Sequence, residues 1–220
     1  LLTLGAAAMI ESDVGTTLTV DTKGLSATTL GLTIGGDGNI TFTETAPIYG
    51  TTATLTKKDT GVLTLEGLNN FTGATNLSRG EIVLNSAGAM PRSTITIGSG
   101  GTLTLDNSST TILDRISDTA ALTMNGGNFN FIGNIAGTAY ETAGALTSAS
   151  GHNIVTVTPG AGGSTTMTFA SLSRTAGASV LFRGTSLGSA PVANVSTIMF
   201  TSAPTVIGAS GAAGTTTTSI

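Results

Sequence analysis

The sequence predicts an all-β protein, and specifically a parallel β-helix (β-solenoid) whose short coils stack into a rod. Three observations support this: apolar and hydroxyl residues alternate, Gly-rich turns separate the alternating segments, and the same short unit recurs. Alternation sends successive side chains to opposite faces of a strand, and threonine suits strands because it is β-branched. Units too small to bury their own core must stack on their neighbours.

The alternating segments run along the whole chain. Glycine-rich links such as 35–38, 98–101 and 125–127 supply the positive φ angles that turns require. The best helix candidate is 111–121. With about 20 to 25 residues per coil, we expect roughly nine to eleven coils and a rod of about 45–50 Å. The expected strands are centred on 32–34, 40–42, 95–97, 103–105, 122–124, 129–131, 155–157, 167–169, 180–182 and 198–200.

Composition excludes several functional classes. The 220 residues include 8 basic and 12 acidic side chains, a net charge of −4, so the clustered cations that neutralise nucleic-acid phosphates are missing. With no cysteine and one histidine, the chain offers neither disulfides nor a multi-histidine or thiolate metal site, and we expect no cofactor. The chain has 44 threonines and 21 serines, so about 30% of its residues carry a hydroxyl.

Charge divides the chain into two regions. Residues 1–141 are expected to form solenoid repeats, whereas 142–220 contain only two charged residues, Arg174 and Arg183. This second region either continues the solenoid or forms a β-sandwich-like assembly module. Its surface is covered by a partner or solvated by hydroxyls and amides. No run of about 18 apolar residues predicts a transmembrane helix, and both ends read as cuts through a longer polypeptide.

Residues 55–82 carry the most specific pattern: LTK at 55–57, GVLTLEG at 61–67 and NNFTG at 69–73. This segment resembles the autotransporter-associated β-strand repeat of large secreted bacterial proteins. Asp59 stands where that repeat has a glycine, and Phe71 replaces its usual tyrosine. The positions that carry the resemblance are Leu55, Lys57, Gly61, Leu63, Leu65, Gly67, Asn69, Phe71, Gly73, Gly80 and Ile82.

The same segment can be interpreted physically. Leu63 and Leu65 should point inward, and Phe71 should enter the core of the next coil. We expect Gly67 to allow a corner with a positive φ angle, and Gly80 to mark the following corner. The amide of Asn69 or Asn70 should satisfy backbone groups at the turn.

The resemblance implies a β-helical passenger exported to the bacterial cell exterior, without catalysis in the repeat. We therefore expect a non-catalytic extracellular structural or adhesive β-solenoid, part of a longer secreted surface protein. Its expected partners are further copies, joined end to end into filaments by strand addition, or other cell-surface components, including glycans. The alternative is a carbohydrate-binding or polysaccharide-degrading β-helix. The two tyrosines of the chain, Tyr49 and Tyr140, are 91 positions apart, which argues against an aromatic platform for sugars.

Candidates for chemistry are few. His152 stands in a turn without a nucleophile elbow, so we expect a surface histidine. Glycoside cleavage needs two carboxylates across a cleft, and the candidates are Asp106, Asp114 and Asp118. Asp37 and Asn39 lie in a Gly-Asp turn and are candidate calcium ligands. That turn occurs once, which favours an ordinary turn over a stacked metal site.

Overall fold

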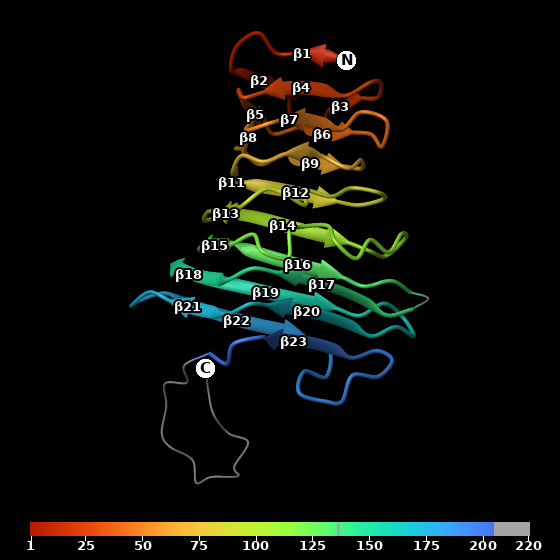
Figure 1. The fold of residues 1–220 in the computed structure, drawn as a ribbon, viewed down its shortest axis with the longest axis vertical. Helices are drawn as coiled ribbons and strands as arrows, with labels where there is room; N and C mark the ends of the chain where they lie inside the picture. The colour runs from red at the N-terminus through yellow and green to blue at the C-terminus, as the bar shows by residue number, and fades with distance from the viewer. Residues whose placement is uncertain (136, 205–220) are drawn as a thin grey trace.

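The structure, a computed structural model, describes residues 1–135 and 137–204. Within them the protein is all-β without helices, and its parallel strands stack as a solenoid of about 8 turns (Figure 1). The first coil lies at one end of the rod, and later coils are added in chain order towards the other end. The solenoid fold predicted from the sequence is confirmed.

The coils have three lateral faces, of which the first two are continuous sheets. The first face consists of β2 (Ala8–Glu11), β5 (Gly31–Gly35), β8 (Thr54–Lys57), β11 (Thr75–Leu77), β13 (Ile95–Ile97), β15 (Leu122–Asn125), β18 (Leu146–Ser150) and β21 (Leu172–Arg174). The second face consists of β3 (Thr17–Val20), β6 (Asn39–Phe42), β9 (Val62–Leu65), β12 (Gly80–Leu84), β14 (Gly101–Asp106), β16 (Asn128–Ile132), β19 (His152–Thr158) and β22 (Ser179–Gly184).

The third face is divided into two sheets. One contains β1 (Leu2–Thr3), β4 (Leu25–Thr28), β7 (Ile48–Gly50) and β10 (Asn70–Phe71). The other contains β17 (Ala139–Ala143), β20 (Thr165–Phe169) and β23 (Ser196–Phe200). Between them the coils are joined by single parallel bridges, Leu68 to Ala89 and Met90 to Ile116.

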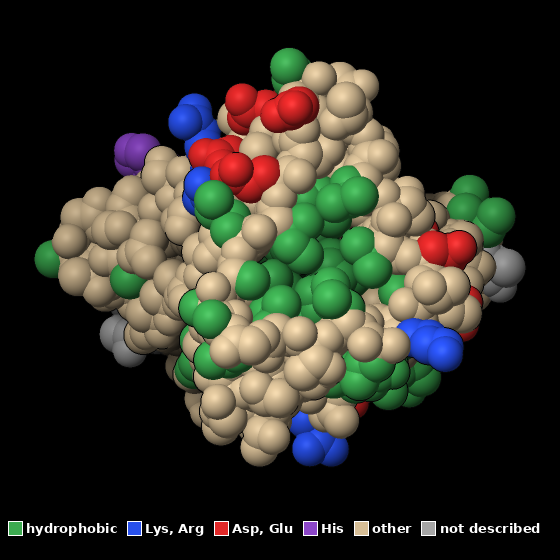
Figure 2. Space-filling model, turned by 90° about the horizontal axis from the view of Figure 1, so that it is seen from above, with side chains coloured by type: hydrophobic (Ala, Val, Ile, Leu, Met, Phe, Trp, Pro, Cys, Tyr) green, Lys and Arg blue, Asp and Glu red, His purple; other side chains and the backbone are tan. Residues whose placement is uncertain are grey.

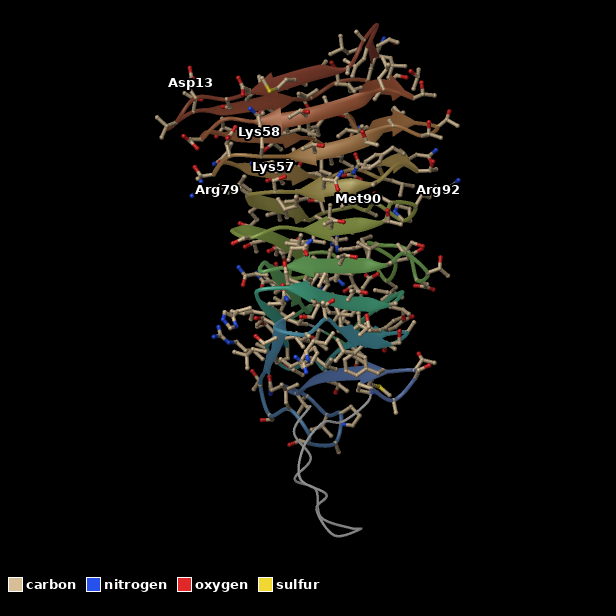
Figure 3. The ribbon with its side chains drawn as sticks, turned by 90° about the vertical axis from the view of Figure 1, so that its left-hand side faces the viewer. Asp13, Lys57, Lys58, Arg79, Met90 and Arg92 are labelled. Atoms are coloured by element: carbon tan, nitrogen blue, oxygen red, sulfur yellow. The ribbon has the colours of Figure 1, made fainter. Side chains whose placement is uncertain are left out.

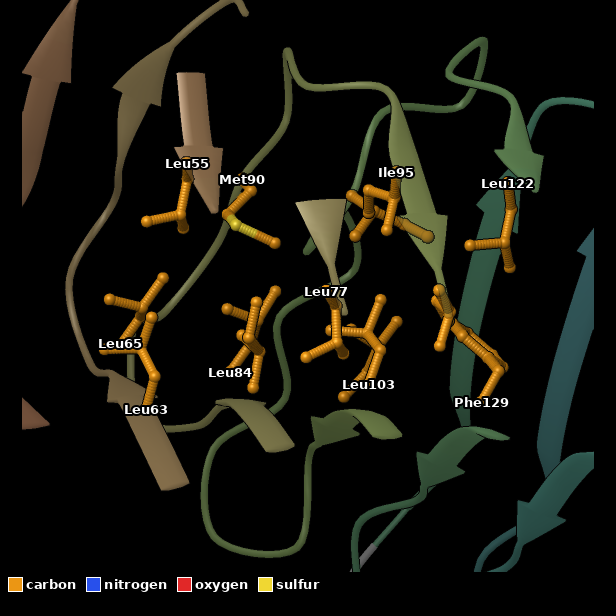
Figure 4. Close-up of a cluster of buried hydrophobic side chains, with 14 of the residues drawn as sticks. Leu55, Leu63, Leu65, Leu77, Leu84, Met90, Ile95, Leu103, Leu122 and Phe129 are labelled. Carbon is orange, nitrogen blue, oxygen red and sulfur yellow. The ribbon is translucent and has the colours of Figure 1, made fainter. Parts of the chain in front are cut away.

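The core consists of rows of apolar side chains, one from each coil, that run along the rod; we call such a row a file. Side chains of the first face, such as Leu55 and Leu77, point towards those of the second face, such as Leu84 and Leu103 (Figure 4). Inward positions of adjacent coils are Cα partners, so each inward side chain has similar surroundings to its partners in the neighbouring coils. One such file contains Leu18, Ile40, Leu63, Ile82, Leu103, Phe129, Val155 and Phe182.

Outward positions explain the high threonine content. The central outward file of the first face is nearly all hydroxyl-bearing, with successive members in register: Thr33, Thr56, Asn76, Thr96, Thr123, Thr147 and Ser173. Hydroxyl side chains therefore form much of the surface that contacts water, where most proteins have charged side chains. The charge-poor region 142–204 follows the same rule, with half-exposed Thr142, Thr147, Thr156 and Thr166.

The chain from residue 142 to 204 continues the solenoid. Strands β18, β19, β21 and β22 extend the first and second faces in parallel register, so this part is not an antiparallel sandwich. Three phenylalanines of this part pack with Phe129 of an earlier coil: Phe169 contacts Phe129 and Phe200, and Phe200 contacts Phe182. Residues 205–220, the end of the region for which an assembly module was the alternative, lie outside the described residues.

The ten strand centres listed above all fall in strands, and 111–121, the best helix candidate in a chain expected to be all-β, forms a loop. The described residues form about 8 turns, where nine to eleven were expected for all 220 residues. Coil length varies along the chain: 22 residues separate Leu18 from its partner Ile40, 19 separate Leu63 from Ile82, and 27 separate Val155 from Phe182. None of the described residues belongs to a helix that could cross a membrane.

Candidate functional site

The strongest candidate site is a groove on the third face, which we call the Tyr49 groove. It consists of two adjoining depressions of about 410 and 460 Å³, both bordered by Tyr49, Asn70 and Arg92. Volumes in this range are typical of small-molecule sites. The first depression is completed by Ser26, Thr28, Gly50, Thr51 and Thr72, and the second by Glu44, Pro47, Leu68, Asn69, Ala87 and Pro91.

Strand register brings the polar side chains of the groove together. Ser26, Tyr49 and Asn70 are consecutive Cα partners on β4, β7 and β10, so they form one outward file across three coils. The next residue of β7 is Gly50, whose Cα partner is the buried Phe71. A Cβ at Gly50 would lie 2.4 Å from the Cβ of the buried Ala53, so larger residues are excluded there.

One edge of the Tyr49 ring lies close to Gly24, and the side chain is partly exposed. The side chain is 39% exposed, while its Cε2 lies only 3.0 Å from where a Cβ on Gly24 would be. Gly24 itself has φ of +66° and lies against the backbone of Pro47. The glycine of the preceding coil thus leaves space for one edge of the ring, and the exposed part of the side chain is open to a ligand.

Arg92 supplies the positive charge of the groove. Its side chain is exposed, and in Figure 3 it projects from the edge of the rod opposite Arg79. Both ion pairs found among the described residues belong to Lys58, so Arg92 is not neutralised by a pair. Glu44 borders only the second depression, which leaves the first without an acidic side chain.

The predicted repeat residues lie mainly in the core beneath this groove. Leu55, Leu63, Leu65, Phe71 and Ile82 are buried. Asn69 is also buried. Its Oδ1 accepts a hydrogen bond from Ile48 N at 2.8 Å, and its Nδ2 donates to Gly67 O and Ala89 O. Of the two asparagines considered for this role, Asn69 joins the coils, and the exposed Asn70 faces the groove.

The glycines of the repeat are needed mainly for close packing between coils. A Cβ at Gly61 would lie 1.9 Å from Gly38 O, and one at Gly73 would lie 2.2 Å from Ala53 O. Gly80 has a positive φ of +74°. The expectation of a positive φ at Gly67 was wrong: a Cβ there would lie 2.8 Å from Glu44 O, and this approach is what requires glycine.

Lys57 occupies an inward position between Ile34 and Leu77 and is 1% exposed. Its stem continues the apolar file. Its Nζ donates to the backbone oxygens of Lys58 and Asp59 at the corner (Figure 3). Burial lowers the pKa of Lys57, and Asp59 opposes this effect. The side chain therefore caps a turn from inside the rod.

Asp37 and Asn39 join adjacent coils at the corner between the first and second faces. Asp37 Oδ1 accepts hydrogen bonds from the Thr60 amide at 3.1 Å and its hydroxyl at 2.5 Å, which hold the pKa of Asp37 below its ordinary value. Asn39 Oδ1 accepts from Val62 N at 3.1 Å. Across 1–135 and 137–204, no three His, Asp or Glu side chains gather as metal ligands would.

The other chemical candidates are dispersed. His152 is exposed and its Nδ1 lies 2.7 Å from Ser179 Oγ, on the next coil. Asp106 caps a local turn by accepting from Ser108 N. Burial, with a smaller contribution from Asp118, raises the pKa of Asp114. None of these carboxylates borders the Tyr49 groove.

Sequence reasoning missed a buried polar cluster around Arg115. This guanidinium is fully buried and donates to Asn107 Oδ1 and to the backbone oxygens of Gly88, Ser86, Asp106 and Thr110. Burial lowers its pKa to about 10. These bonds fix loop 107–121 in a non-helical course. The sequence gives no local signal for this burial, because Arg115 stands between Asp114 and Asp118, as an exposed charged residue would.

Glu141 lies beside this cluster and is also fully buried. Its carboxyl accepts hydrogen bonds from Arg115 N at 3.0 Å and Ile116 N at 3.3 Å, joining loop 107–121 to β17. Burial raises the pKa of Glu141 to about 8 despite these two donors. The pair is structural, because it lies inside the rod and holds adjacent coils together.

Comparison with protein families, curated proteins and solved structures finds no match to this chain.

Proposed function

We propose that this chain is a non-catalytic, extracellular structural or adhesive rod of the autotransporter-associated repeat type, within a longer bacterial surface protein. One observation carries the proposal: every coil is hydrogen-bonded in parallel to the next around a continuous apolar core. Such a stack is stiff because bending it would break inter-strand bonds and open the core. The low charge and the absence of cysteine suit a protein that persists outside the cell.

Filament formation is the specific form of assembly that we propose. Apolar side chains fill the middle of the end face at the first coil, surrounded by polar groups (Figure 2). Leu18 belongs to the inward file yet is 40% exposed, whereas its partner Ile40 is 1% exposed. A further parallel coil from a second copy could cover this face by strand addition.

The test compares two lysine substitutions of equally exposed leucines. L18K places a charge on the end face, whereas L113K places one on a lateral loop, where Leu113 is 42% exposed. We expect light scattering and electron microscopy to show elongated assemblies for wild type and L113K but monomers for L18K. Monomeric wild type at high concentration, or assembly of L18K like that of L113K, would contradict end-to-end association.

The alternative function is a carbohydrate-binding or polysaccharide-degrading β-helix. The structure supports carbohydrate binding as a candidate but gives no support for degradation. The supporting observation is the Tyr49 groove, which combines an accessible aromatic ring with amide, hydroxyl and guanidinium groups. Cleavage needs two carboxylates across the bond, and Glu44 is the single acid that borders the groove. The groove is therefore a candidate for recognition without hydrolysis.

A further inference from the structure

We infer that the Tyr49 groove binds an anionic saccharide, a sugar chain carrying carboxylate groups. This inference rests on the carbohydrate-binding alternative above and is independent of filament formation. A sugar ring has an apolar face formed by its C–H groups and a rim of hydroxyls. Its recognition calls for an aromatic surface beside planar and hydroxyl hydrogen-bonding groups.

The groove provides the aromatic surface at Tyr49. A side chain at position 24 would crowd the edge of the ring, so Gly24 leaves Tyr49 the room it occupies. Tyrosine also offers an apolar body with a polar tip, which matches the mixed character of a sugar.

Polar groups lie on both sides of this ring along the rod axis. Ser26 and Asn70 flank Tyr49 at one strand spacing each, so the file spans roughly 10 Å, comparable to a disaccharide. Thr28 and Thr72 add hydroxyls to the same depression. The direction of the file therefore favours an extended chain lying along the rod over a single compact molecule.

The charged side chains at the Tyr49 groove favour an anionic ligand. Arg92 forms no ion pair with any described residue, and the first depression contains no acid. A guanidinium binds a carboxylate through two parallel hydrogen bonds. Glu44 lies in the second depression and disfavours a carboxylate there, which places the acidic group of the ligand beside Ser26, Tyr49 and Arg92.

The test uses trigalacturonate and its fully methyl-esterified form, which has nearly the same shape without the charge. We expect calorimetry to show binding of trigalacturonate, with the ester at least about ten-fold weaker. R92Q and Y49A should each weaken trigalacturonate binding by at least about ten-fold. Matched controls are R79Q, at an exposed arginine on the opposite edge, and Y140A, at a tyrosine 49% exposed on β17.

Each outcome decides a separate point. Equal affinity for acid and ester would overturn the anionic preference while leaving carbohydrate binding intact. No binding of either would overturn both, without bearing on filament formation. Binding that R92Q leaves unchanged would show that the groove is not the site. Arg92 is exposed, so R92Q tests the inference even if Y49A disturbs the packing on Gly24.

Discussion

Buried polar residues are the individual side chains on which this fold depends most. Arg115, Asn69 and Asn153 are each almost fully buried, and each uses its polar atoms to bind backbone groups of other coils. A buried donor or acceptor left without a partner destabilises a protein by about 1–3 kcal/mol. In a solenoid the backbone groups at coil corners are the ones that the sheets leave unpaired, and these side chains satisfy them.

Glu141 makes the stability of the protein depend on pH. Its pKa is raised to about 8 in the folded protein from an ordinary value of 4.5. Between these values the folded state binds more protons than the unfolded state, so stability falls as pH rises. We expect unfolding free energy to decrease by on the order of 3 kcal/mol from about pH 5 to about pH 9.

Urea unfolding at several pH values, followed by circular dichroism, measures this effect. E141Q keeps an acceptor for one of the two backbone donors but cannot ionise, so its stability should vary less with pH than that of the wild type. If the two proteins showed parallel pH profiles, Glu141 would not be the titrating group.

At the scale of elements, the corners determine how neighbouring coils are joined. The corner before β10 is held by Asn69, which contacts Ile48 at the start of β7, Gly67 of its own coil and Ala89 of the following coil. One side chain thus connects three successive coils. The next residue, Asn70, lies on the same strand with its side chain exposed.

We expect N69A to lower the unfolding free energy by about 2–4 kcal/mol, because three hydrogen bonds disappear and buried backbone groups lose partners. The matched variant N70A should change it by less than about 0.5 kcal/mol. Thermal and urea unfolding of the two variants provide the comparison. Equal stability of N69A and N70A would show that the Asn69 bonds contribute nothing net.

At the scale of the whole molecule, the rod is held by backbone ladders and apolar files instead of charge. The described residues contain two ion pairs, Lys58 with Glu11 at 3.1 Å and with Asp59 at 3.4 Å, and all three side chains are partly exposed. Exposed ion pairs contribute about 0–1 kcal/mol each. The net charge of −4 is also small for 220 residues.

Stability should therefore depend little on ionic strength. We expect the unfolding free energy to change by less than about 1 kcal/mol between about 20 mM and about 500 mM NaCl. K58A should reduce even this small dependence, because Lys58 takes part in both ion pairs. A strong salt dependence in the wild type that persists in K58A would reveal long-range charge interactions that the structure does not show.

The sequence by itself determined the class of fold and the strand positions. A two-residue alternation fixes which side chains face the core, and this local rule holds for Leu63, Leu65 and Ile82. The sequence also allowed us to predict that an asparagine at position 69 or 70 would bind backbone groups at the corner. The number of coils could not be predicted, since the longer later coils have no fixed period in the sequence.

Only the tertiary structure decided which distant residues meet. The Tyr49 groove joins residues from four successive coil segments, and Arg115 meets Glu141 across 26 positions, because inter-coil register sets these contacts. The local sequence around Gly67 suggested a positive φ, but the true constraint is the Glu44 backbone of the preceding coil. Alternation is encoded locally, whereas proximity between coils depends on coil length and register, which accumulate over the whole chain.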